Sequence, residues 1–416
     1  MGLYQHKPNL RRVVYHVGAH QCSQVISMKI NFLLYLCFAC IVSACSGGGG
    51  SSAQVSTPLP VTPPAADSVQ KKAALLAAKL GKPARLLIGL GSANLADIQA
   101  QNLQIDIYDQ YLNGVGSGSW PTWNSPSGAY VQLVAKNADT LGAIPMFTLY
   151  QMASNGDGNL SGLSDLSFMS AYWNNVRLLF QQIRLYGKPA LVNFEPDFWG
   201  YTQRISTNAD PATVFALVNF DADCSNLPNN VAGISQCLLQ IARKYAPNAY
   251  VGFPPALFPD LYSTALGYMQ KLGAGNADFI VMQTLDRDAG CFEALPQPSY
   301  CQRAGSGWYW DETNARTPNF TQHFALASSY HTGLQLPLLW WQTPLGVPSA
   351  QAGGRDGRWR DNRVHYFLSH PTELVAAGGI GVVFSTGEIH QTSINTDGGQ
   401  FKTMSGNYLA SPAALP

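Results

Sequence analysis

The chain has 416 residues, of which 46% are hydrophobic and only 12% are charged. This length and apolar content allow one large domain or two domains of ordinary size. A formal net charge of +1, without a basic run, gives no electrostatic reason to expect nucleic acid as a partner.

The amino-terminal segment has the pattern of an export signal. Residues 28–45, MKINFLLYLCFACIVSAC, combine a basic start, a short apolar run and small residues before Cys45. The apolar run is too short for a membrane-spanning helix. Since residues 1–27 fit no signal, we expect Met28 to be the true start.

The VSAC ending at Cys45 resembles the lipobox of bacterial lipoproteins. The resemblance implies that Cys45 carries a lipid anchor to the cell envelope and, with Ser46 behind it, that the protein reaches the outer membrane. A plain secreted protein or an uncleaved anchor is the alternative. We therefore expect residues 1–44 to be an upstream extension with a signal peptide. Residues 45–66, rich in Gly, Ser and Pro, are expected to form a flexible tether, and residues 67–416 a single domain.

Four of the eight cysteines fall within this expected domain: Cys224, Cys237, Cys291 and Cys301. In an exported chain, four cysteines suggest two disulfides, and pairing Cys224 with Cys237 and Cys291 with Cys301 closes the shortest loops. Zinc is the competing interpretation, but neither a CxxC spacing nor a His pair supports it. We expect no metal and no cofactor.

Beyond the tether, apolar runs that end in polar or glycine residues alternate with stretches of helical periodicity. The expected strands are 85–91, 104–112, 144–150, 190–196, 249–255, 278–286, 336–346 and 379–387. The expected helices include 68–82, 93–101, 129–142, 168–187, 233–247, 264–275 and 363–379, the last interrupted at Pro371.

Eight alternating strands and helices predict a parallel sheet closed into a (β/α)8 TIM barrel. The helix at 68–82 is expected to cover the bottom of this barrel. An open doubly wound sheet is the alternative. However, its glycine-rich turn would have to be GLGSANLAD at 89–97, which lacks the third glycine of GxGxxG.

The stretch PALVNFEPDFWGY, residues 189–201, places polar groups at every second position of the fourth strand. Because alternate residues of a strand face the same side, Asn193, Glu195 and Asp197 are expected to face the barrel axis. They would approach the carboxyl end of the strands, where the active sites of such barrels lie. Burying a lone carboxylate is costly, so these acids are either paired with cations or used in chemistry.

Other strand ends supply matching groups. The same alternation turns Asp106 and Tyr108 inward on the second strand, and Trp340 and Gln342 on the seventh. Ion pairing with arginine is the alternative for Asp106 and Asp286. Tryptophans in the loops after the strands are expected to form an aromatic rim. The expected substrate-binding residues are Asp106, Tyr108, Trp120, Trp123, Asn193, Trp199, Tyr201, Gln283, Trp308, Trp340 and Gln342.

An exported barrel with an acid at the end of its fourth strand and tryptophans around it resembles a glycoside hydrolase. The resemblance implies that Glu195 is the acid/base. The largest group of these enzymes places a nucleophilic glutamate at the end of the seventh strand, where this chain has Gln342. FEPD at 194–197 is similar in spacing to the acid-x-acid pattern of chitinases and one lysozyme group.

Hydrolysis of a glycosidic bond needs a protonated carboxyl and an ionised partner. We expect Glu195 to be the general acid and its partner to be Asp197, Asp286 or Asp106, in that order. The expected protein is a monomeric glycoside hydrolase acting on a polysaccharide or oligosaccharide. The alternative is a surface lipoprotein that binds carbohydrate without cutting it, because Gln342 would mark a lost nucleophile.

Overall fold

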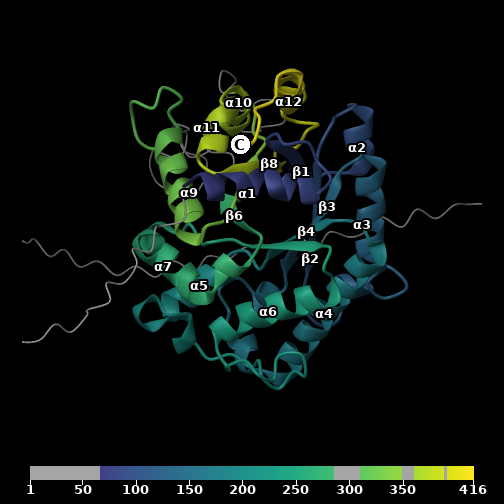
Figure 1. Ribbon diagram of the computed structural model, residues 1–416. Helices are drawn as coiled ribbons and strands as arrows, with labels where there is room; N and C mark the ends of the chain where they lie inside the picture. The colour runs from purple at the N-terminus through teal and green to yellow at the C-terminus, as the bar shows by residue number, and fades with distance from the viewer. Residues whose placement is uncertain (1–65, 285–309, 349–359, 388–390) are drawn as a thin grey trace, which may run out of the picture. The chain divides into compact units, whose positions relative to one another are not determined.

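Eight parallel strands form a closed barrel in the computed structural model, which describes residues 66–284, 310–348, 360–387 and 391–416 (Figure 1). The strands pair in chain order, and β1 pairs with β8 to close the sheet. Their bounds are β1 Leu87–Gly91, β2 Ile107–Asn113, β3 Ile144–Tyr150, β4 Ala190–Phe194, β5 Ala249–Phe253, β6 Phe279–Gln283, β7 Leu338–Pro344 and β8 Gly379–Ser385. The predicted (β/α)8 barrel and its eight strands are confirmed.

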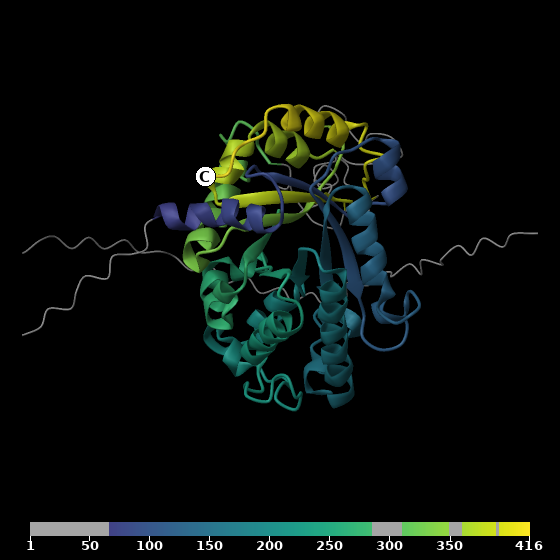
Figure 2. The same cartoon turned by 45° about the vertical axis from the view of Figure 1, so that its right-hand side comes forward.

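Helices surround the sheet (Figure 2). They are α1 Ala66–Lys79, α2 Leu95–Ala100, α3 Ala129–Thr140, α4 Leu166–Tyr186, α5 Phe198–Ile205, α6 Val231–Tyr245, α7 Tyr262–Leu272, α9 Phe320–Leu334, α10 Arg363–Ser369, α11 Pro371–Ala376 and α12 Gln400–Ala410. The predicted break at Pro371 separates α10 from α11, because proline lacks the N–H that a continuous helix needs there.

The molecule has two apolar cores. The larger one lies between the sheet and the helices, and the smaller one fills the inside of the barrel. Ala73 and Leu76 of α1 pack against the inner core, so α1 covers the bottom of the barrel as predicted (Figure 1).

The two cores show which strand face points inward, and the inward facing predicted for Tyr108 on β2 and for Trp340 on β7 is wrong. Ile107 and Trp341 belong to the inner core, whereas Tyr108 and Trp340 belong to the outer one. The reason is that the lower layers of a barrel interior are themselves apolar. Alternation of apolar residues therefore does not tell the inner face of a strand from the outer face.

Asp106 is a structural ion-pair residue near the start of β2. Its carboxylate accepts two hydrogen bonds from the Arg85 guanidinium, at 2.8 and 3.0 Å, and one from the Ile88 backbone N–H at 2.9 Å. Ion pairing, the alternative left open for Asp106, is thus the observed state. Asp106 does not lie at the carboxyl end of the strands, so its expected role in binding or catalysis is wrong.

The predicted disulfide between Cys224 and Cys237 is confirmed, with their Cα atoms 5.5 Å apart. It ties the loop before α6 to the helix itself. Cys291 and Cys301 lie outside the described residues. Within the described part of the chain, no helix is both long and apolar enough to cross a membrane.

Replacing Asp106 with asparagine is expected to destabilise the fold by about 3 kcal/mol, because Arg85 would lose its counter-charge in a largely buried pair. Urea unfolding measures the change. The matched control is Asp260→Asn, since Asp260 forms a comparable bidentate pair with Arg204 in an exposed setting, and it should leave stability within experimental error. Equal effects of the two substitutions would contradict this account.

Candidate active site

Asp109 places its carboxyl group inside the barrel lumen. Its Oδ1 accepts a hydrogen bond from Thr148 Oγ1 at 2.8 Å, and its Oδ2 accepts one from Trp341 Nε1 at 2.9 Å. Burial raises the pKa of Asp109 to about 7, and these two hydrogen bonds oppose the shift. A substantial fraction of Asp109 therefore carries a proton at neutral pH. Asp109 is absent from the predicted site because the prediction gave β2 the opposite facing.

Tyr111 and Gln342 follow Asp109 towards the carboxyl end of the barrel, which we call the mouth. The Tyr111 ring lies 5.7 Å from the Trp341 ring, and Gln342 Nε2 donates a hydrogen bond to the Tyr111 hydroxyl. Gln342 has a φ of 52° within an irregular stretch of the β7–β8 pairing. Because of this irregularity, Trp341 and Gln342 both approach Tyr111 although they are consecutive. Gln342 is thus inside, as predicted.

Trp340, in contrast, points out of the barrel. It is fully buried, and its Nε1 donates to His323 Nε2 of α9 at 2.8 Å. Its predicted place in a binding cleft is wrong, since the outer core encloses it.

Asn193 of β4 faces the lumen, as predicted. Its Nδ2 lies 3.4 Å from Thr148 Oγ1, the same hydroxyl that donates to Asp109. Its Oδ1 is buried and finds no hydrogen-bond partner among the described residues. Asn193 therefore has an acceptor available inside the barrel.

Glu195 does not continue this inward row. Its φ of 52° interrupts the strand alternation, and its side chain is fully buried. Oε2 accepts hydrogen bonds from the backbone N–H groups of Gln151, at 2.9 Å, and Met152, at 3.0 Å. Glu195 thereby caps the turn that follows β3.

The Glu195 carboxyl lies in the shell of side chains between the sheet and the helices. Tyr172 of α4 lies beside it. Burial raises the pKa of Glu195 to about 8, while the N–H donors and Tyr172 oppose the shift. The Glu195 carboxyl is bound to the turn after β3 and points into this shell, not into the lumen. The geometry therefore supports a structural role for Glu195 in place of the expected role as general acid.

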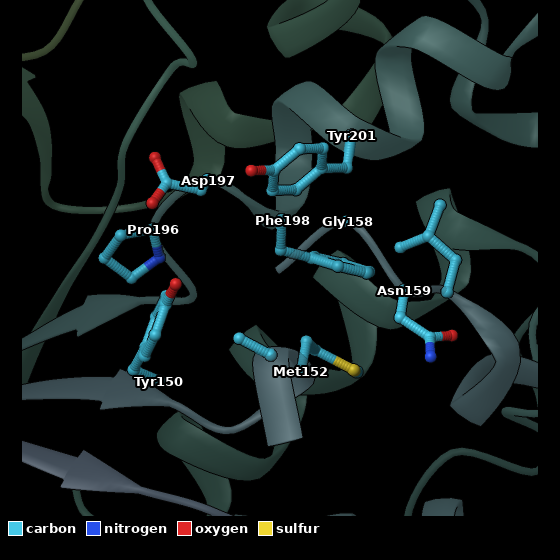
Figure 3. Close-up of a pocket in the computed structure, with 10 residues that line it drawn as sticks. Tyr150, Met152, Gly158, Asn159, Pro196, Asp197, Phe198 and Tyr201 are labelled. Carbon is cyan, nitrogen blue, oxygen red and sulfur yellow. The ribbon is translucent and has the colours of Figure 1, made fainter. Parts of the chain in front are cut away.

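Asp197 and Tyr201 lie in a pocket between the segments that follow β3 and β4 (Figure 3). The cavity has a volume of about 10 Å³, roughly the space of one water molecule. Its lining residues are Tyr150, Met152, Ala153, Gly158, Asn159, Leu160, Pro196, Asp197, Phe198 and Tyr201. Burial and the negative charges of Asp197 and Asp157 raise the pKa of Tyr150 well above its usual range. Asp197, predicted to be catalytic, thus lines a cavity.

The Tyr150 ring connects this pocket to the lumen. It stands edge-to-face with Tyr111, with the ring centres 6.1 Å apart, and Tyr111 in turn packs on Trp341. The lumen carboxyl of Asp109 and the pocket carboxyl of Asp197 are therefore linked through a short row of aromatic rings.

Most of the predicted tryptophan rim serves packing. Trp120 and Trp199 are fully buried, and their indole N–H groups donate to Gln151 Oε1 and to the Phe194 carbonyl, respectively. Trp123 is 41% exposed and stands edge-to-face with Tyr130. A tryptophan in a polar loop can bury its apolar ring while its indole N–H donates a hydrogen bond to the protein.

Two further predicted site residues lie on opposite faces of the sheet. The Tyr108 hydroxyl donates to the Ala93 carbonyl at 3.1 Å outside the lumen. Gln283 is buried at the end of β6, on the same face as Val281 of the inner core. Asp286 and Trp308 lie outside the described residues. No group of three or more His, Cys, Asp or Glu side chains that could hold a metal ion occurs in the described ranges.

No protein-family model matches the chain, and no curated protein sequence matches it. Solved structures of similar fold include an endo-β-1,4-mannanase from Cellulomonas fimi, which is 11% identical with a TM-score of 0.47 over 82% of this chain and 74% of that one. A GH5-4 endoglucanase from Bacteroides salanitronis is 13% identical with a TM-score of 0.46 over 76% and 86%. A D-allulose 3-epimerase from Methylomonas sp. is 12% identical with a TM-score of 0.40 over 78% and 98%. These likenesses concern the barrel fold alone.

The structural assignment of Glu195 predicts a pH effect on stability. Between its usual pKa of 4.5 and its raised pKa of about 8, the unfolded chain is ionised while the folded chain keeps the proton. Stability should therefore fall as pH rises through this window, by at most about 1.4 kcal/mol per pH unit for this group. Glu195→Gln copies the protonated form, so we expect it to flatten this decline.

Urea unfolding at intervals between about pH 5 and 8 measures the two slopes. Asp109, whose pKa is also raised, remains in both proteins and should preserve a smaller decline in the variant. If Glu195→Gln were less stable than the unaltered protein at neutral pH, the carboxylate would be ionised in the fold and the assignment would be wrong.

Proposed function

We propose that the protein is a glycoside hydrolase that acts on a polysaccharide or oligosaccharide at the mouth of the barrel. Asp109 serves as the general acid and Asp197 as its ionised partner. The observation that carries the proposal is the Asp109 carboxyl, which faces the lumen and whose pKa burial raises to about 7.

The chemistry requires two carboxyl groups in opposite states of protonation. A general acid works best when its pKa lies near the operating pH, and a buried carboxyl near an ionised one is a recurring way to divide the two roles. Asp197 is proposed for the second role because it lines the pocket beside Tyr150. The Tyr111 and Tyr150 rings, which contact each other edge-to-face, offer apolar surface for a sugar ring.

Polar groups in the lumen can bind sugar hydroxyls. The Asn193 Oδ1 is an acceptor without a partner among the described residues. The pair formed by Gln342 and Tyr111 is partly exposed. Amide and phenol groups both accept and donate hydrogen bonds. A ligand rich in hydroxyl groups needs partners of both kinds, because each hydroxyl is a donor and an acceptor.

A second candidate function is carbohydrate binding without cleavage. It is favoured by the two positions where the glycoside-hydrolase resemblance places catalytic glutamates. One is Gln342, which is bonded to Tyr111, and the other is Glu195, whose carboxyl caps a buried turn. Neither position presents a carboxylate to the mouth.

Replacing Asp109 with asparagine tests the proposed acid. We expect cleavage to slow by a factor of about 100 or more, with ligand binding retained. In the unaltered protein, activity should decline as pH rises above about 7, because the acid then loses its proton. Reducing-sugar release from a panel of soluble polysaccharides measures the rate, and calorimetry measures binding.

The control for this experiment is Glu195→Gln, which should keep the rate of the unaltered protein. Full activity of Asp109→Asn would contradict the role of Asp109. Binding of a glycan by the unaltered protein, without any product, would support the second candidate function.

We further propose that the mature protein is anchored to the bacterial cell envelope, in the outer membrane, through a lipid on Cys45. The support is the sequence pattern of residues 28–45. Labelling cells with a clickable fatty acid should mark the full chain, and Cys45→Ala should abolish the label and release the protein from the membrane fraction. Cys40→Ala, which alters the apolar run alone, should keep the label. Persistence of the label in Cys45→Ala would contradict the anchor.

A further inference from the structure

Asp109, Thr148 and Asn193 form a row of hydrogen bonds across the neighbouring strands β2, β3 and β4. Asn193 Nδ2 lies 3.4 Å from Thr148 Oγ1, and Thr148 Oγ1 lies 2.8 Å from Asp109 Oδ1. Each of the three side chains is at most 1% exposed. Bulk solvent therefore cannot replace a partner that one of them lacks, and the row has to satisfy its hydrogen bonds from within.

The observed arrangement suits an ionised Asp109. The Asn193 amide donates to Thr148, the Thr148 hydroxyl donates to Oδ1, and Trp341 Nε1 donates to Oδ2 at 2.9 Å. All of these donors point towards the carboxylate, which can only accept. Asn193 Oδ1 is left without a partner among the described residues.

A protonated Asp109 needs a different arrangement, because its O–H is a donor that requires an acceptor when buried. Of the two side chains that bind the carboxyl, Trp341 can only donate, whereas the Thr148 hydroxyl can donate or accept. Thr148 is thus the partner that can serve both forms of Asp109. When it accepts from Asp109, its own hydrogen has to turn to another acceptor.

The Asn193 amide can supply that acceptor by turning over. Its oxygen and nitrogen differ little in size, and rotation about χ2, which is soft in asparagine, exchanges them. Oδ1, which has no partner in the first arrangement, then faces the Thr148 hydroxyl. The direction of every hydrogen bond between Asn193 and Asp109 is thereby reversed.

We propose that Thr148 and Asn193 are positioning residues that reverse this row each time Asp109 gains or loses its proton. The inference rests on the proposed function for the role of Asp109, and it adds the residues that serve it. When the proton passes from Oδ1 to the glycosidic oxygen, Thr148 turns its O–H to the new carboxylate and Asn193 turns Nδ2 to Thr148. The carboxyl keeps its place, because Trp341 holds Oδ2 in both states.

The titratable neighbours of Asp109 do not compete with this exchange. Tyr108 and Tyr130 are the described tyrosines whose pKa responds to the charge of Asp109. Burial is the main cause that raises the pKa of both, to about 12 for Tyr130, so both keep their protons near neutral pH. The side chains that reach Asp109 from β3 and β7, a threonine and a tryptophan, do not titrate.

NMR spectroscopy of side-chain amides in the purified protein tests the reversal. The Asn193 amide signals, assigned through Asn193→Ser, should shift with the same midpoint as the Asp109 carboxyl, near pH 7, and this response should be lost in Asp109→Asn. Asn314 is the control, because its Nδ2 donates to the Tyr366 hydroxyl at 2.8 Å, which contacts Glu373 in a separate row. Its signals should be the same in Asp109→Asn as in the unaltered protein.

Thr148→Val removes the hydroxyl at nearly constant shape. Asp109 should still titrate, but the Asn193 signals should no longer follow it. The kcat on a cleaved glycan should fall by about 2- to 12-fold, the factor that one hydrogen bond is worth, with KM nearly unchanged. Thr148→Ser keeps a hydroxyl and should restore both properties. Thr148→Ala replaces Thr148→Val in these measurements should the valine variant not fold.

The outcomes separate this inference from the proposed function. Asn193 signals that follow Asp109 through Thr148, without cleavage of any glycan, would support the reversal and contradict the hydrolase. Cleavage that depends on Asp109, with Asn193 signals that stay constant through its titration, would overturn the inference and keep the hydrolase. Asn193 signals that follow Asp109 without the Thr148 hydroxyl would also overturn it.

Discussion

Closure of the sheet between β1 and β8 is the constraint on which the candidate site depends. The closing strands carry glycines on their inner face: a Cβ added at Gly89 would lie 2.8 Å from the Ile107 side chain, and one added at Gly91 would lie 3.0 Å from Asp109 Oδ2. These glycines leave room for β2 to send a full side chain into a narrow lumen. The result is an apolar floor around Ile107 and a carboxyl above it, held by Thr148 and Trp341.

Glu195 and Asp109 are both buried carboxyls with raised pKa values, yet they serve different purposes. Glu195 faces the shell between sheet and helices, where its oxygen satisfies two backbone N–H groups of a turn. Asp109 faces the lumen, beneath the partly exposed pair of Tyr111 and Gln342. A raised pKa alone does not identify a catalytic acid, because burial shifts the pKa in both places. The direction in which each side chain points decides between the two roles.

The sequence predicted the architecture well and the site poorly, for related reasons. Short segments of sequence determine the features that were predicted correctly. These are the strand and helix periods, the break at Pro371 and the local disulfide at Cys224. The inner face of β2 depends instead on how the sheet closes, and both of its faces carry apolar residues. At Glu195 and Gln342 a single residue with positive φ changes the side that the chain presents. Such a local turn leaves no trace in the alternation of polar and apolar residues.

The most direct test of the account is the titration of Asp109 in the folded protein. Carbon-13 labelling of aspartate carboxyl groups, with the signal assigned through Asp109→Asn, gives the pKa by NMR spectroscopy. The account predicts a transition near pH 7 that the variant lacks. A carboxyl already ionised at about pH 5, close to the ordinary range for aspartate, would contradict the role of Asp109 and with it the proposed site.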